Sequence, residues 1–189
     1  GMSGSKTRHL YNAVVALEIP GRETRYLEVG TWKGSSLVSA MFQNHHAKGF
    51  AVDNWSEFGG PRDEFRANLV AHLLPQKQSI RILEKDCFAL TRDDVDGFAP
   101  FDVYLYDGSH AREHHKAAIT HMAPFLADVA VLMVDDWNWP EVKAGTMEGI
   151  AESGLEVLFA QDVGPHGQSD RAGFWNGCGV FVLSRWTMQ

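Results

Sequence analysis

The sequence predicts a single α/β domain built around a mostly parallel β-sheet. Apolar, β-branched and aromatic runs recur at intervals of roughly 20–30 residues with helix-like stretches between them, a pattern typical of βαβ units. Several runs are almost continuously hydrophobic, such as Val129–Val134, as expected for parallel strands covered on both faces. The length of 189 residues corresponds to about one domain.

Seven runs are candidate strands, and four helices are predicted between them, after a short one in Thr7–Pro20. The strands are Arg25–Val29, Gly49–Val52, Ile80–Leu83, Phe101–Tyr106, Val129–Val134, Leu155–Ala160 and Val180–Leu183. Serines after Gly34 begin the first of the four helices, Pro75 follows the end of the second, and Pro140 marks the start of the last. These helices are Ser35–Gln43, Arg62–Leu74, Ala111–Leu126 and Glu141–Ser153.

The composition argues against several function classes. The net charge is −7, and no basic run is present, so we expect no nucleic-acid partner. No stretch approaches the roughly 18–20 apolar residues of a membrane span, and the start lacks the apolar core of a signal peptide, so we expect a cytoplasmic protein without a membrane partner. Residues 1–6 resemble a cloning remnant and are expected to be a disordered start to a single domain over 1–189. Cys87 and Cys178 fit neither a disulfide framework nor a metal-binding spacing.

Five successive strands end in an acidic residue or run straight into one. Because the carboxyl ends of parallel strands meet at one edge of the sheet, these acids are expected to gather there. Carboxylates at such an edge are costly to desolvate unless they meet donors or a cation. Any single acid could instead begin a turn or cap a helix, but five in succession favour a binding site. The acids are Glu28, Asp53, Asp86, Asp107, and the pair Asp135 and Asp136.

The turn after the first strand carries two glycines, Gly30 and Gly34, followed by a helix start. Glycines let a backbone approach a ligand closely, and a helix N-terminus offers free N–H groups. The spacing fits neither the dinucleotide fingerprint nor the phosphate-binding loop. Asp53 lies roughly 20 residues downstream, a position that suits the two hydroxyls of a ribose. A nucleoside-bearing ligand without a pyrophosphate is the simplest fit.

A second group of residues follows the fourth and fifth strands. Asp107, Asp135 and Asp136 would repel one another unless a hard cation joined them, and oxygen ligands favour Mg²⁺ over Zn²⁺. His110 lies three residues after Asp107 and could accept a proton near neutral pH, or simply make a structural hydrogen bond at a helix start.

Residues 110–114 also match the inverted zinc-protease pattern H-x-x-E-H. That reading needs both histidines on one helix and leaves the strand-end acids unexplained, so we disfavour it. His114, His115 and His121 are expected on the surface of the predicted helix. Trp55, Trp137 and Trp139 adjoin strand ends and would either wall a pocket or pack in the core.

Together these segments resemble the class I S-adenosylmethionine (SAM)-dependent methyltransferases. The resemblance is closest to small-molecule O-methyltransferases that use a divalent metal, of the macrolide-sugar and catechol types, and it covers Leu10 to Arg185. It implies a Rossmann-like three-layer sandwich whose seven-stranded sheet has an antiparallel last strand. The segments that carry it are Tyr26–Ser36, Val52–Asp53, Lys85–Asp86, Phe101–His110 and Ala130–Trp137.

The resemblance implies roles for individual residues. Mg²⁺ would be bound by Asp107, Asp135 and Asp136, and His110 with Asp107 would be catalytic, His110 accepting the proton of the acceptor oxygen. Asp53 would bind the ribose, Asp86 and Cys87 would flank the adenine, and the glycine turn would hold the methionine end. The implied cofactor residues are Glu28, Gly30, Thr31, Gly34, Ser35, Asp53, Asn54, Asp86, Cys87 and Asp107.

The implied reaction is SAM-dependent, Mg²⁺-assisted O-methyl transfer to a small molecule with neighbouring hydroxyls. The stretch before the first strand is shorter than in many relatives. The acceptor site would therefore come from Asn54–Pro61, Trp137–Pro140 and Asp162–Trp175, or from a second subunit of a homo-oligomer. A non-catalytic cofactor-binding protein of the same fold and an NAD(P)-binding oxidoreductase are the alternatives, the latter disfavoured by the missing dinucleotide fingerprint.

Overall fold

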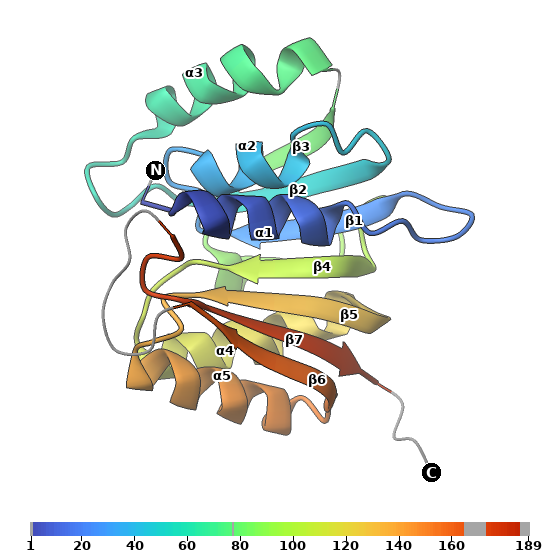
Figure 1. The fold of residues 1–189 in the computed structure, drawn as a ribbon, viewed down its shortest axis with the longest axis vertical. Helices are drawn as coiled ribbons and strands as arrows, with labels where there is room; N and C mark the ends of the chain where they lie inside the picture. The colour runs from blue at the N-terminus through green and yellow to red at the C-terminus, as the bar shows by residue number, and fades with distance from the viewer. Residues whose placement is uncertain (1, 77, 165–172, 186–189) are drawn as a thin grey trace.

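A computed structural model describes residues 2–76, 78–164 and 173–185. Its seven-stranded sheet has the order β3-β2-β1-β4-β5-β7-β6 (Figure 1). Strands β1 to β5 pair in parallel, whereas β7 pairs antiparallel with both β5 and β6. The antiparallel last strand is therefore confirmed. The strands are β1 (Thr24–Val29), β2 (Ala47–Asp53), β3 (Ser79–Glu84), β4 (Phe101–Tyr106), β5 (Leu126–Asp135), β6 (Glu156–Val163) and β7 (Cys178–Ser184).

Helices cover the sheet on both faces, which gives the expected three layers. Side chains of α1, α2 and α3 pack in one buried cluster with one set of strand residues, and α4 and α5 pack in the other (Figure 1). Alternation along β1 divides its residues between the clusters, since Tyr26 faces one and Leu27 the other. The helices are α1 (Ser5–Val15), α2 (Ser35–Met41), α3 (Arg62–His72), α4 (Arg112–Met122) and α5 (Pro140–Glu152), with short 3₁₀ turns η1 (Leu74–Gln76), η2 (Cys87–Ala89) and η3 (Ala123–Phe125).

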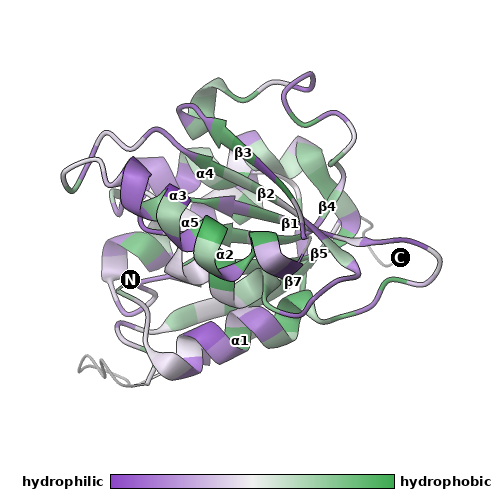
Figure 2. Ribbon diagram, turned by 90° about the horizontal axis from the view of Figure 1, so that it is seen from above, coloured by the Kyte–Doolittle hydropathy of each residue, from purple (hydrophilic) through white to green (hydrophobic). Residues whose placement is uncertain are grey.

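The hydrophobic residues concentrate in the strands, while the helices carry both hydrophobic and hydrophilic residues (Figure 2). Strand β4 is buried along its whole length, including Asp102, which is paired with Arg22 at 2.5 Å. The sheet is less well covered toward its β6 edge. Val129 of β5 is 52% exposed there, and most residues of β6 are exposed. Within the described residues no helix combines the length and the apolar character needed to cross a membrane.

Three sequence predictions differ from the structure. The helix predicted over 111–126 ends at Met122, because η3 and the first residues of β5 occupy its last turn. Helix α1 begins at Ser5, so Ser5 and Lys6 belong to a helix rather than to a disordered start. The N–H groups of Lys6 and Thr7 both donate to the carbonyl of Gly173, which ties this helix to the C-terminal part of the chain.

His115 is the third difference, because it is buried rather than on the helix surface. Its side chain is 1% exposed, its ring packs edge-on against Tyr106 with centroids 4.8 Å apart, and its Nδ1 lies 3.3 Å from the Thr146 hydroxyl. Burial, with a smaller contribution from the charge of His110, lowers the pKa of His115 to about 4. The buried imidazole is therefore neutral at physiological pH.

The lowered pKa of His115 makes the stability of the fold depend on pH. Between about pH 6.5 and pH 4 the unfolded chain binds a proton that the folded chain does not, so stability falls as the pH falls through this window. We expect His115→Gln to reduce this loss by up to about 3 kcal/mol, measured by urea unfolding at several pH values. An unchanged pH profile for His115→Gln would contradict the assignment.

Candidate functional site

A cavity of about 580 Å³ opens at the carboxyl ends of the parallel strands. It lies where the strand order reverses between β1 and β4, the switch point at which open α/β sheets bind ligands. Its volume falls within the roughly 300–1,000 Å³ typical of small-molecule sites. The predicted site residues that line it are Gly30, Thr31, Ser35, Asp53, Asn54, Asp86, Cys87, Asp107, His110, Asp135 and Asp136.

The glycine turn connects β1 to α2 and forms one wall of the cavity. Gly30 has φ +87°, and a Cβ on it would lie 1.9 Å from the carbonyl oxygen of Asp107, so only glycine lets the two strand ends approach this closely. Gly34 also has a positive φ, and its Cα faces the ring of Phe65 rather than the cavity. The predicted ligand contact of Gly34 is therefore not observed in the cavity lining.

Glu28 lies beneath this turn and does not line the cavity. Its carboxylate is fully buried and accepts hydrogen bonds from the hydroxyls of Tyr26, at 2.5 Å, and Ser36, at 2.7 Å. Burial raises the pKa of Glu28 to about 7, although the two hydroxyl donors oppose this shift. Through its hydrogen bond with Ser36, the Glu28 carboxylate fixes the start of α2, and Glu28 is not among the residues that line the cavity.

Asp53 ends β2 and holds the turn from the opposite side. Its two carboxylate oxygens accept hydrogen bonds from the backbone N–H groups of Trp32 and Trp55, each at 2.7 Å. The carboxylate still faces the cavity. Further along the wall, Asp86 accepts from the N–H of Phe88 at 2.9 Å, and burial raises the pKa of Cys87 to about 12, which keeps its thiol neutral.

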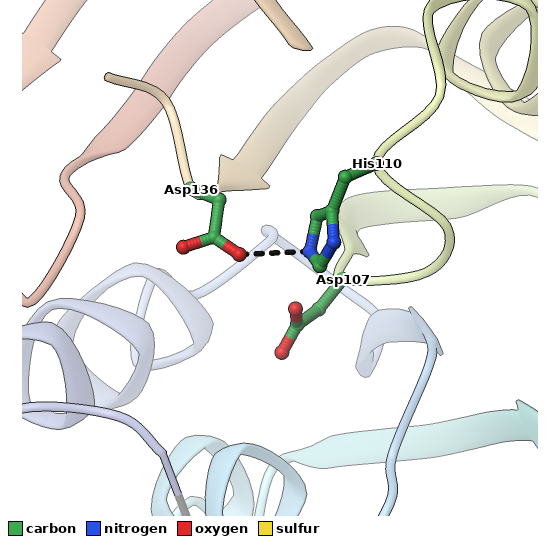
Figure 3. Close-up of side chains that lie close together, drawn as sticks. All are labelled: Asp107, His110 and Asp136. Atoms are coloured by element: carbon green, nitrogen blue, oxygen red, sulfur yellow. Dashed lines mark ion pairs between the residues drawn. The ribbon is translucent and has the colours of Figure 1, made fainter. Parts of the chain in front are cut away.

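Asp107, His110 and Asp136 form a close group at the ends of β4 and β5 (Figure 3). One ligand atom from each lies within 4.8 Å of the others. Nε2 of His110 lies 2.7 Å from Oδ2 of Asp136, a close ion pair without the alignment of a hydrogen bond. This contact raises the pKa of His110, although burial opposes the shift. Asn176 donates to the other oxygen of Asp136 at 2.5 Å, and the His110 ring lies edge-on to Trp139.

This group differs from the predicted metal ligands by one residue, because His110 takes the place of Asp135. Successive strand residues point to opposite faces, and Asp135 pairs with Cys178 beside Tyr11 on the α1 face. Asp136 has φ +53°, a sharp turn of the backbone that directs its side chain toward His110.

The carboxylates at this edge resist ionising together. Burial, followed by the charges of Asp135 and Asp136, raises the pKa of Asp107 well above its usual value. Burial and the charge of Asp136 raise the pKa of Asp135 to about 7. A bound cation would relieve this repulsion, so the converging carboxylates of Asp107 and Asp136 fit a divalent metal, with the His110 imidazole beside them.

The inverted zinc-protease reading fails on geometry. His110 lies in the loop before α4, and only His114 is on the helix. Nδ1 of His114 contacts the Ser109 hydroxyl at 2.7 Å, and among the described residues His114 joins no group of metal-ligand side chains.

The sequence predicted that Asn54–Pro61, Trp137–Pro140 and Asp162–Trp175 lie near the site, but it did not mark the individual residues that line the cavity. Of the three tryptophans, Trp139 lines the cavity and Trp137 packs in the core against Phe181. Trp55 does both, since it lines the cavity and its ring packs on Phe65 in the buried cluster of α1, α2 and α3. No sequence motif marks the additional lining residues, although the glycines and short polar residues around them mark loops. They include Met2, Ser3, Glu57, Phe58, Phe88, Tyr106, Trp175 and Asn176.

The close approach at Gly30 generates a test by substitution. We expect Gly30→Ala to destabilise the fold by roughly 2 kcal/mol more than Gly97→Ala, measured by urea unfolding. Gly97 has a similar φ of +77° but no atom within 4 Å of the methyl that alanine would add, so it controls for backbone strain alone. Equal losses in the two variants would show that the approach to Asp107 is not tight.

A family model for a methyltransferase domain matches residues 27–137, and no curated protein matches the chain. Solved structures share the fold at low identity. A protein from Corynebacterium glutamicum has a TM-score of 0.69 at 12% identity, covering 100% of this chain and 85% of that one. Magnesium protoporphyrin IX methyltransferase from Synechocystis, with bound SAM, has a TM-score of 0.64 at 12% identity, covering 95% and 79%.

An O-methyltransferase family protein from Burkholderia thailandensis has a TM-score of 0.59 at 15% identity, covering 95% of this chain and 56% of that one. These likenesses agree with the observed fold. The family model spans residues 27–137 of 189, more than half of the sequence. The chain therefore belongs to the methyltransferase domain family.

Proposed function

We propose that the chain transfers a methyl group from SAM to a hydroxyl oxygen of a small molecule with neighbouring hydroxyls, assisted by a divalent cation such as Mg²⁺. One observation carries the proposal. The glycine turn and Asp53 lie in the same cavity as the group of Asp107, His110 and Asp136. A non-catalytic cofactor-binding protein would not need an acid–imidazole pair beside its cofactor.

The half of the cavity at the ends of β1 and β2 suits SAM. Two of the similar structures, both of the Synechocystis methyltransferase, contain SAM or its product. Asp53 would offer carboxylate lone pairs to the ribose hydroxyls, and Asp86 and Cys87, which line the same cavity, would flank the adenine. The surrounding carboxylates favour a cationic sulfonium over the neutral thioether product, which assists product release.

The half at the ends of β4 and β5 suits the acceptor. When bound, SAM supplies an activated methyl group, and a divalent cation lowers the pKa of the hydroxyl that it binds. Asp107 and Asp136 would hold the cation, because their carboxylates converge there. His110 borders the same point and would accept the hydroxyl proton, while Asp136, at 2.7 Å, stabilises the imidazolium that forms.

The cofactor half predicts a specific loss of affinity. Calorimetric titration should show SAM binding to the wild type and binding weakened about tenfold in Asp53→Asn, since a charge-assisted hydrogen bond is lost. Glu64→Gln, an exposed acid that does not line the cavity, should bind as the wild type does. Absence of binding at millimolar SAM would refute the proposed cofactor.

If the proposed roles of the acceptor half are right, substitutions there should abolish turnover without weakening cofactor binding. Asp136→Asn should abolish methyl transfer to phenols and sugars with neighbouring hydroxyls while SAM affinity stays near the wild-type value. His110→Ala should lower kcat by about 10² or more, yet keep metal affinity. The readouts are radiolabelled methyl transfer and calorimetric titration of Mg²⁺.

Two results would count against this division of roles. Methyl transfer that persists in a chelator would remove the cation from the proposal. A loss of metal affinity in His110→Ala equal to that in Asp136→Asn would make His110 a ligand instead of a proton acceptor.

A further inference from the structure

A second cavity, of about 520 Å³, lies over helix α2 and shares only Ser35 with the cavity at the strand ends. Helix α2 lies between α1 and α3, and all three helices contribute to the lining (Figure 1, Figure 2). The residues of α1 and α3 that line it are spaced four apart, Arg8 with Asn12 and Asn68 with His72, so each pair presents one helix face to the cavity.

Every charged or titratable side chain among the described lining residues of the second cavity is basic. These side chains are Arg8, His9, Lys33 and His72. The sign is opposite to that of the whole chain, which has a net charge of −7, and carboxylates line the cavity at the strand ends. A hollow lined by one sign of charge concentrates ligands of the other sign, so the second cavity favours an anion.

The two permanent cations of this lining are available to a ligand. Arg8 is half-buried, and its guanidinium makes no hydrogen bond or ion pair within the part of the chain that the structure describes. Lys33 is paired with Glu64 at 2.6 Å, but their side chains are 31% and 61% exposed. A solvated surface pair of this kind contributes little, so Lys33 can also serve an incoming anion.

Hydrogen bonds between the helices hold the second cavity in shape. The Asn12 amide of α1 donates to the carbonyls of Ser39 and Phe42, at 2.9 and 2.8 Å, and so joins α1 to the end of α2. The Asn68 amide of α3 donates to the carbonyl of Lys33 at 2.9 Å. The basic side chains therefore project from walls that are already fixed, which lowers the entropic cost of binding.

The floor of the second cavity is apolar. Val38 and Phe42 line it, and Phe42 is 46% exposed, a large apolar surface left open to solvent. A cavity of about 520 Å³ falls in the range of small-molecule sites and is far larger than a bare phosphate ion. The lining therefore suits a ligand with an anionic group and an apolar or aromatic body.

We propose that the second cavity binds a small phosphate monoester. Arg8 and Lys33 bind its phosphate, since a guanidinium fork and an ammonium group match a dianion with three free oxygens. Val38 and Phe42 pack against its apolar body. This site is separate from the proposed methyl transfer and does not depend on it.

The test uses phenyl phosphate, with inorganic phosphate and phenol as probes that each keep only one half of the molecule. Each probe is titrated calorimetrically into the full chain, with and without saturating S-adenosylhomocysteine. We expect phenyl phosphate to bind at least about tenfold more tightly than either half, with or without S-adenosylhomocysteine. Phe42→Ala, which keeps the carbonyl bonded to Asn12, should bring phenyl phosphate and inorganic phosphate within about twofold of each other.

Charge variants locate the phosphate. Arg8→Gln should weaken the binding of phenyl phosphate about tenfold, because a charge-assisted hydrogen bond is lost. Arg66→Gln makes the same charge change at an exposed position of α3 outside the cavity and should stay within about twofold of the wild type. Glu64→Gln removes the partner of Lys33 and should strengthen binding about twofold, a gain that damage to the fold would not produce.

Three outcomes would overturn the inference. Phenol that binds as tightly as phenyl phosphate would remove the anion from the site. Equal losses in Arg8→Gln and Arg66→Gln would reduce the effect to the overall charge of the protein. Displacement of phenyl phosphate by S-adenosylhomocysteine would place the probe in the cavity at the strand ends.

Discussion

Repulsion among carboxylates held at one edge of the sheet is the constraint on which the site depends. The parallel topology brings Asp107, Asp135 and Asp136 together, and burial deprives them of water. Neighbouring groups offset part of the cost: His110 pairs with Asp136, and Asn176 donates to it. The remaining repulsion among these carboxylates would be relieved by a bound cation.

The fold was predictable because it follows from local patterns that repeat along the chain. The run Phe101–Tyr106, apolar or aromatic except for Asp102, forms the fully buried strand β4 with the predicted bounds. His115 was misplaced because the helix pattern alone does not reveal that α5 covers its side of α4, where the Thr146 hydroxyl meets its ring. The predicted strand Leu155–Ala160 forms β6 over Glu156–Val163, and its residues are largely exposed at the edge of the sheet, which the apolar run alone does not indicate.

Some residues of the site could be predicted from local sequence patterns, and others depend on the three-dimensional structure. Gly30 and Asp53 could be placed from their positions at strand ends, since the topology alone brings these ends together. His110, and not Asp135, lies beside Asp107 and Asp136. This arrangement depends on the positive φ of Asp136, which could not be predicted from the sequence. Glu57 and Phe58 lie in a loop without periodicity, so only the folded structure shows that they line the cavity.

The attachment of α1 has a practical consequence for handling the protein. Met2 and Ser3 line the cavity, and the N–H groups of Lys6 and Thr7 donate hydrogen bonds to the carbonyl of Gly173. The segment before α1 therefore lies at the opening of the site (Figure 1). Ser184 ends β7 at the opposite edge of the sheet, where it pairs with Val129 near the start of β5. An affinity tag or fluorescent fusion joined ahead of Met2 would crowd the entrance used by ligands, whereas one joined after Arg185 would be carried on the far side.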